Sequence, residues 1–232
     1  QYVAAELLER VEVFRGASAF LNGAAPGGSG LGGSVNIVPK RAGEEPLNRF
    51  TLGYESQSHF VGAADVSRRF GEEGNSTGVR VNLVQRGGET SVDNQDRNLS
   101  VASVGIDHES KHARISLDLG FQDHQVDAPR PAVTPSGGIP DAPESDTNFA
   151  QPWTYTNEKQ LFGAVRGEYD FTDTMTGWVA YGFREGEEKN IFANPTAQVN
   201  GDSSAYRFDN ARNDSIRSGE VGLNIEFETG EV

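Results

Sequence analysis

Apolar and polar residues alternate over long stretches of the chain from Arg49 onward. In the clearest stretch, Val221, Leu223 and Ile225 are separated by glycine and asparagine. One apolar face opposite one polar face over about 10 residues is typical of a strand that crosses a membrane in a barrel. Strands of soluble sandwiches also alternate, but they usually have only about 5–6 residues. The pattern predicts eight strands, at 49–58, 60–70, 77–87, 97–108, 111–122, 159–171, 174–187 and 213–228.

The connections between these strands form two alternating sets. The members of one set are all short, at 71–76, 109–110 and 172–173. Three of the four members of the other set are longer, and the whole set runs through 59, 88–96, 123–158 and 188–212. Outer-membrane barrels have short periplasmic turns and long external loops. A sandwich has no general reason to gather its long loops at one end, although some binding sandwiches do.

The first 46 residues have a different pattern. A short helix is expected at 4–8 and strands at 10–15 and 34–38, with another short helix over 19–21 and a glycine-rich loop at 22–33. The sequence therefore predicts two domains, 1–46 and 47–232, with the junction at about 42–48.

Composition narrows the classes of function. The chain has no cysteine, which excludes disulfides and cysteine nucleophiles. A net charge of -14 leaves no basic stripe to neutralise phosphates, so no nucleic-acid partner is expected. No nucleophilic triad is visible, and no metal site is expected. His108 and His112 flank a predicted turn, and the acidic segment 93–96 offers at most a loose external calcium site.

A motif in the N-terminal domain resembles a known family. Residues 8–23 read LERVEVFRGASAFLNG, followed by Pro-Gly-Gly at 26–28 and GSVNIVPKR at 33–41. This order resembles the end of the plug domain of TonB-dependent outer-membrane receptors, in the ferric-siderophore branch. Ala17, Asn22 and Pro39 depart from the usual residues without breaking the pattern. The segments at 61–67 and 161–163 are also similar to siderophore receptors, on order and spacing.

The resemblance implies an all-β fold that is part of a plugged 22-stranded antiparallel transmembrane β-barrel, joined to the C-terminal end of an α+β plug. A closed barrel of eight strands encloses little more than its own side chains, whereas plugged barrels have about 22 strands. We therefore expect about fourteen further strands, and the N-terminal part of the plug, to lie outside this chain.

The implied function is TonB-energised uptake of a ferric siderophore across the cell outer membrane of a Gram-negative bacterium. The siderophore is the transported ligand, and neither a covalently bound cofactor nor enzyme activity is expected. TonB would bind an N-terminal segment outside this chain, and lipid and lipopolysaccharide would surround the barrel. Two alternatives remain at this stage. One is the same family with another cargo, such as cobalamin, haem or a glycan; the other is a surface β-sandwich adhesion module.

The resemblance also implies roles for particular residues. Four charged residues in or next to the first strand would lock the plug to the barrel wall: Glu9, Arg10, Glu12 and Arg15. The last three also fit a strand with one polar face. Ligand contacts are expected from the plug apex and the long loop, at Tyr2, Val3, Arg130, Trp153 and Tyr155. The two aromatic loop residues fit membrane-interface anchors equally well. The long loop 123–158 carries six acidic residues and one arginine, which favours a neutral or cationic ligand such as a hydroxamate complex.

Overall fold

The computed structural model describes residues 3–16, 32–55, 57–139 and 141–227. The chain begins with a 3-10 turn, η1 (Ala5–Leu7), and a hairpin of two antiparallel strands, β1 (Leu8–Arg15) and β2 (Gly33–Pro39). These elements match the expected helix and strands of the first domain. The short helix over 19–21 and most of the glycine-rich loop lie outside the described residues.

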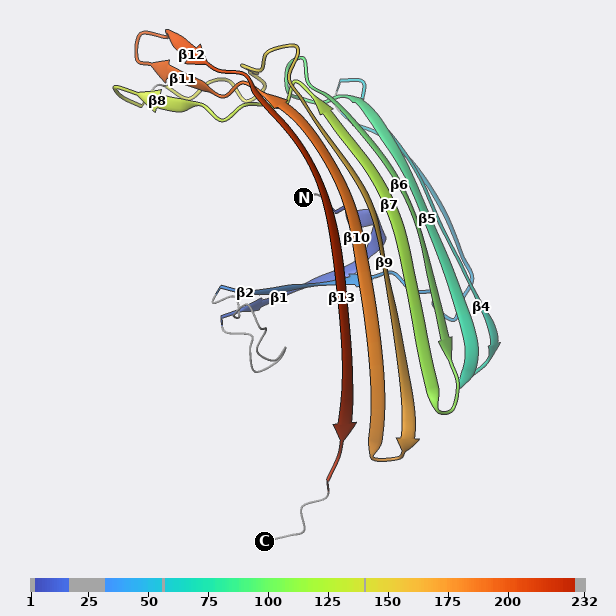
Figure 1. Ribbon diagram of the computed structural model, residues 1–232. Coiled ribbons are helices and arrows are strands. Elements are labelled where there is room, and N and C mark those ends of the chain that lie inside the picture. Colours follow the sequence, from blue (N-terminus) through green and yellow to red (C-terminus); the bar gives the residue numbers. More distant parts are fainter. Residues whose placement is uncertain (1–2, 17–31, 56, 140, 228–232) are drawn as a thin grey trace.

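Eight antiparallel strands form one large curved sheet (Figure 1). Its order follows the chain, so each strand between the two edges pairs with the preceding and the following strand of this sheet. All eight predicted strands are present, as β3 (Leu47–Tyr54), β4 (Phe60–Glu72), β5 (Asn75–Glu89), β6 (Asp96–Glu109), β7 (Ala113–Asp127), β9 (Tyr155–Thr172), β10 (Met175–Phe192) and β13 (Phe208–Ile225). The described residues form no second large sheet facing this one, which argues against a sandwich.

The last three strands are longer than the sequence indicated. β9, β10 and β13 each have 18 residues. A strand of that length spans about 60 Å at about 3.3 Å per residue, twice the roughly 30 Å of a bilayer's hydrocarbon core. These strands therefore extend beyond the apolar region.

The two ends of the large sheet differ. The turns at 73–74, 110–112 and 173–174 gather at one end, which we call the turn end, and the long connections gather at the other, the loop end (Figure 1). At the loop end, three short strands form a separate loop sheet that reaches over the concave side: β8 (Thr134–Ser136), β11 (Pro195–Gln198) and β12 (Ser203–Ala205). The sequence predicted loops here, and the loop sheet is a finding of the structure.

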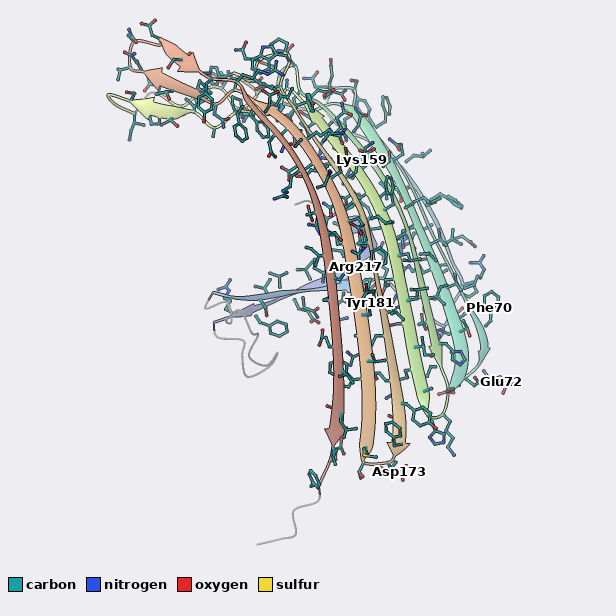
Figure 2. The ribbon with its side chains drawn as sticks, viewed as in Figure 1. Phe70, Glu72, Lys159, Asp173, Tyr181 and Arg217 are labelled. Carbon is teal, nitrogen blue, oxygen red and sulfur yellow. The ribbon has the colours of Figure 1, made fainter. Side chains whose placement is uncertain are left out.

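The convex face of the large sheet is apolar near the turn end and charged near the loop end. Phe70 and Val179 are more than half exposed on the apolar part. Nearer the loop end, Lys159 pairs with Asp123 at 3.4 Å, and Arg217 pairs with Glu185 (Figure 2). No helix in the described ranges is both long enough and apolar enough to cross a membrane.

A small core joins the N-terminal segment to the concave face. Leu99 is fully buried there, and Phe162 packs against the core. The Phe162 ring lies directly over Gly120, where a Cβ atom would stand within 2.3 Å of it. The other core residues come from η1 and the residue before it, and from the central strands: Ala4, Leu7, Val84 and Val101. The hairpin consequently projects from the middle of the concave face (Figure 1).

Candidate functional site

Residues 40–42, which follow β2, are bound to the large sheet by a cluster of charges. Lys40 Nζ lies 3.1 Å from an oxygen of Asp65, and the Arg41 guanidinium donates to both carboxylate oxygens of Asp118. Arg69 donates to the carbonyl of Ala42 at 2.8 Å. Two parallel bonds from a guanidinium to a carboxylate fix orientation as well as distance. The end of the N-terminal segment is therefore held in one position on the large sheet.

Asp65 is the centre of this cluster. It is 7% exposed and accepts two bonds of 2.8 Å from Arg80, in addition to its contact with Lys40. Arg80 also donates to the carbonyl of Arg41 at 2.7 Å. A buried charge is tolerated when it is paired and hydrogen-bonded, and removing one partner of such a pair is costly.

The beginning of the segment is attached independently. The Ala4 amide donates to Gln122 Oε1 at 3.0 Å, and Glu6 lies 3.3 Å from Arg86. Together with residues 40–42, these contacts attach the N-terminal segment to β4–β7 at both of its described ends. Contacts of Glu6, Lys40 and Arg41 with the large sheet were not predicted from the sequence. The sequence did contain a sign of these contacts. Asp65, Arg80 and Asp118 are charged residues on the face of the strands that otherwise carries small or polar residues.

The four charges expected to lock the plug behave differently from one another. Glu9 lies 3.9 Å from Arg80, across the interface with the large sheet. Arg10 instead pairs with Glu12 at 2.6 Å within the hairpin. The Asn36 amide, donating at 2.8 Å, and the Arg10 guanidinium hold the pKa of Glu12 below its ordinary value. Arg15 ends β1, at the far end of the hairpin from the sheet. Contacts of these last three residues with further wall strands stay a prediction.

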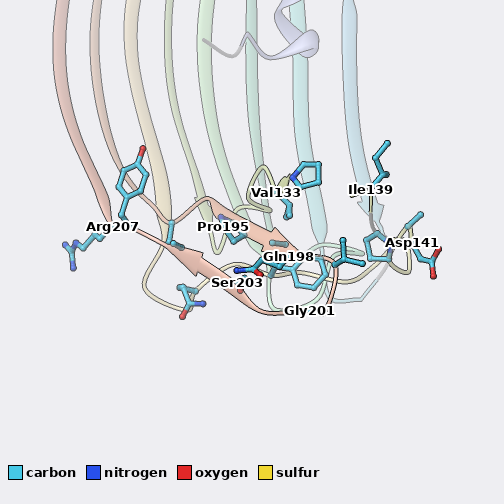
Figure 3. A pocket seen from close by; sticks show the side chains of 18 of the residues that line it. Val133, Ile139, Asp141, Pro195, Gln198, Gly201, Ser203 and Arg207 are labelled. Carbon is cyan, nitrogen blue, oxygen red and sulfur yellow. The ribbon is translucent and has the colours of Figure 1, made fainter. Parts of the chain in front are cut away.

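A cavity of about 1000 Å³ lies at the loop end, between the segments 133–153 and 193–207 (Figure 3). Its lining is mainly apolar and includes Val133, Ile139, Phe149 and Trp153. Its two charged residues, Asp141 and Arg207, lie at opposite sides (Figure 3). Binding sites for small molecules are typically such concave, mostly apolar hollows with a few placed polar groups. We call this hollow the loop pocket.

The structure separates the five expected ligand residues. Trp153 lines the loop pocket, and the Arg207 guanidinium lies 5.4 Å from its ring centroid. Arg130 donates to the carbonyl of Ser145 at 2.6 Å and is not part of the pocket lining. Tyr155 begins β9, and Val3 lines a second cavity of about 340 Å³ beside the hairpin. Tyr2 lies outside the described residues.

The loose calcium site considered at 93–96 has no support in the structure. Among the described residues, no group of three or more histidine, aspartate or glutamate side chains could hold a metal ion. The Gln95 carbonyl and amide take part in backbone hydrogen bonds with Thr90 and Val92 instead. His108 forms a 2.9 Å hydrogen bond with Thr77 across β5 and β6.

Comparison with known proteins places this arrangement in a family. No family model matches the chain. The ferrichrome receptor FcuA of Yersinia enterocolitica is 39% identical over 235 residues, which cover 100% of this chain and 31% of that protein. The crystal structure of BauA, the ferric preacinetobactin receptor of Acinetobacter baumannii, matches 98% of the chain with a TM-score of 0.92 and 36% identity. The chain belongs to the TonB-dependent outer-membrane receptors.

The fold extends to more distant members of this family. The siderophore receptor PiuA of Acinetobacter baumannii matches 99% of the chain with a TM-score of 0.80 at 16% identity. The chain spans about a third of the length of the first relatives, with 34% of both the BauA and PiuA structures covered. The large sheet is thus a section of an outer-membrane receptor barrel.

Proposed function

We propose that residues 1–46 are the end of the plug, that residues 47–232 begin the barrel, and that the receptor imports a ferric siderophore with TonB as its energy source. The observation that carries this proposal is the 39% identity with a ferrichrome receptor along the whole chain, loops included. The separation of the hairpin from the large sheet supports the division into two domains. Uptake breaks no bond, so the proposal includes neither catalysis nor a covalent cofactor.

The geometry suggests an order of events. The loop end faces outward, because outer-membrane barrels keep their long loops outside and their short turns in the periplasm. The ligand meets the loop pocket first, with Trp153 as its flat apolar contact and Arg207 as its cationic one. The hairpin lies deeper, across the concave face (Figure 1). TonB then pulls on an N-terminal segment of the plug outside this chain, and Val3 and Tyr2 contact the ligand from the plug side.

The charges of the pocket favour a ligand of low net charge. Asp141 and Arg207 are the charged residues of the lining, and the Arg207 guanidinium is also paired with Asp209 at 2.8 Å, so the pocket offers no uncompensated positive charge. A strongly anionic iron complex would find one cation here and a surrounding loop rich in carboxylates, which would disfavour its binding. A neutral ferric hydroxamate fits this balance better.

Uptake by the complete receptor tests this proposal. The full-length gene would be expressed in a strain that lacks its own siderophore receptors, and uptake of radioactive iron would be measured from ferrichrome and from a tricatecholate complex. We expect TonB-dependent uptake from ferrichrome and much less from the tricatecholate. Growth restored by cobalamin or haem, without uptake from any ferric chelate, would reject the proposal.

A further inference from the structure

Asn148 joins two loops at the loop end. Its side-chain amide donates to the carbonyl of Asp93 at 2.9 Å and to the carbonyl of Ala128 at 2.8 Å. A backbone bond of 2.9 Å from the Asp93 amide to the Asp146 carbonyl runs beside it. One side chain in the middle of the long loop thus binds both the loop 90–95 and the residue that follows β7. A carboxamide suits this position, because both partners are acceptors and its nitrogen supplies two donors.

The segment that carries Asn148 also forms one side of the loop pocket. Phe149, Gln151 and Trp153 line the pocket, whereas Asn148 makes its bonds away from it. The Asn148 side-chain oxygen accepts from the Ala150 amide at 3.0 Å, which fixes the local backbone between these lining residues. Anchoring Asn148 therefore sets the position of three residues of the pocket lining.

The base of the same loop is closed tightly. The Ala128 amide donates to the Thr154 carbonyl at 2.8 Å, and both residues are buried. Ala128 has a φ of 46°, in the left-handed region that a residue with a side chain adopts at some cost. The Ala128 carbonyl that this turn exposes is the one that Asn148 binds. The strained turn and the amide bridge are thus parts of one arrangement.

We propose that Asn148 is a positioning residue for the ligand pocket, which holds the long loop against the connection 90–95 so that Phe149, Gln151 and Trp153 meet the ligand in a fixed arrangement. The ligand part of this inference rests on the proposed function. An ordered loop binds more tightly because less conformational entropy is lost on binding. Asn148 itself need not touch the ligand.

The first test measures loop order without any ligand. Amide hydrogen exchange would be followed in the full-length receptor in detergent, for wild type and for Asn148→Ala and Asn148→Asp. We expect the amides at 144–154 to exchange at least about ten-fold faster in the alanine variant, because the side chain no longer binds the carbonyls of Asp93 and Ala128. The aspartate variant should exchange faster still, since a carboxylate facing two carbonyls is repelled. Unchanged exchange in both variants would overturn the proposal.

Thr147→Ala is the matched control, because the Thr147 amide donates to the Glu144 carbonyl and alanine keeps that bond. Its exchange should equal that of wild type, and a control that loosens the loop equally would count against a specific role for Asn148.

The second test measures affinity for ferrichrome by titration calorimetry. We expect about ten-fold weaker binding in Asn148→Ala and wild-type binding in Thr147→Ala. Faster exchange with unchanged affinity would overturn the positioning role. Failure of the wild-type receptor to bind ferrichrome would instead count against the proposed ligand, and the exchange measurement would still decide whether Asn148 orders the loop.

Discussion

At the scale of single residues, the Arg41–Asp118 pair is a contact whose loss should lower stability measurably. Both side chains are largely shielded, at 30% and 21% exposure, and the carboxylate is their shared centre. Asp118→Ala leaves the Arg41 guanidinium without its bidentate partner. We expect the free energy of unfolding to fall by about 1–3 kcal/mol, because an unpaired and partly buried charge retains its desolvation cost. Urea denaturation of the receptor in detergent would measure this.

Asp209→Asn provides the control for that change. Asp209 pairs with Arg207 at 2.8 Å, but both side chains are 56% exposed. Water replaces the partner of an exposed pair, so no measurable change in stability is expected. Equal stabilities of the Asp118 and Asp209 variants would show that the N-terminal segment does not depend on the Arg41 contact.

These residues also show the limit of the sequence at this scale. The alternation in 10–15 predicted a strand with charges on it, and that strand is present as β1. The placement of the hairpin decides which of these charges contact the large sheet. Alternation of apolar and polar residues carries no information about that placement. Arg10 and Glu12 pair with each other, whereas Lys40 and Arg41 reach Asp65 and Asp118 across long sequence separations.

At the scale of elements, the strands were predictable and the loop sheet was not. Long alternating runs identified all eight strands of the large sheet, because one face of each is apolar. The predicted strand began too late in β9 and ended too early in β10, because near the loop end the convex face becomes charged and the alternation disappears. β8 has three residues and β11 has four, and they pair in parallel although about sixty residues separate them in the sequence. No local sequence pattern predicts such a pairing.

The loop pocket makes the prediction that belongs to this scale. Trp153→Ala removes an aromatic lining residue and the ring beneath Arg207. We expect affinity for ferrichrome to fall by about ten-fold or more, because truncated tryptophans often cost about 2 kcal/mol at binding sites. Calorimetric titration of the full-length receptor would measure the change.

The second tryptophan of the chain is the natural control. Trp178 lies near the turn end, with the Arg166 guanidinium 4.4 Å from its ring centroid. Trp178→Ala removes the same type of ring from the same type of contact, but far from the pocket. Affinity should remain at the wild-type value; a comparable loss would mean that the Trp153 effect comes from general destabilisation.

At the scale of the whole molecule, the convex face should determine how the receptor sits in its membrane. On β10 the convex positions change from Val179 and Tyr181 to Glu185 and Glu187. Lys159 lies toward the loop end in Figure 2. We therefore expect it to lie outside the hydrocarbon core, on the external side. The apolar part from the turn at 173–174 to this boundary has the length of about ten residues that a barrel strand needs to cross a bilayer.

Val179 lies in the middle of this apolar part and is 58% exposed. Val179→Arg would place a charge near the centre of the hydrocarbon, so we expect the free energy of unfolding in lipid vesicles to fall by about 2–4 kcal/mol. Asn213→Arg places the same charge on the convex face beside Glu187, above the boundary, where the cost should be about 0–1 kcal/mol. Equal costs at the two positions would mean that the boundary between lipid and water does not lie between them. Both variants add an arginine to the convex face, so their difference reports depth together with the pairing that Glu187 offers to an arginine at position 213, which is worth at most about 1 kcal/mol at an exposed site.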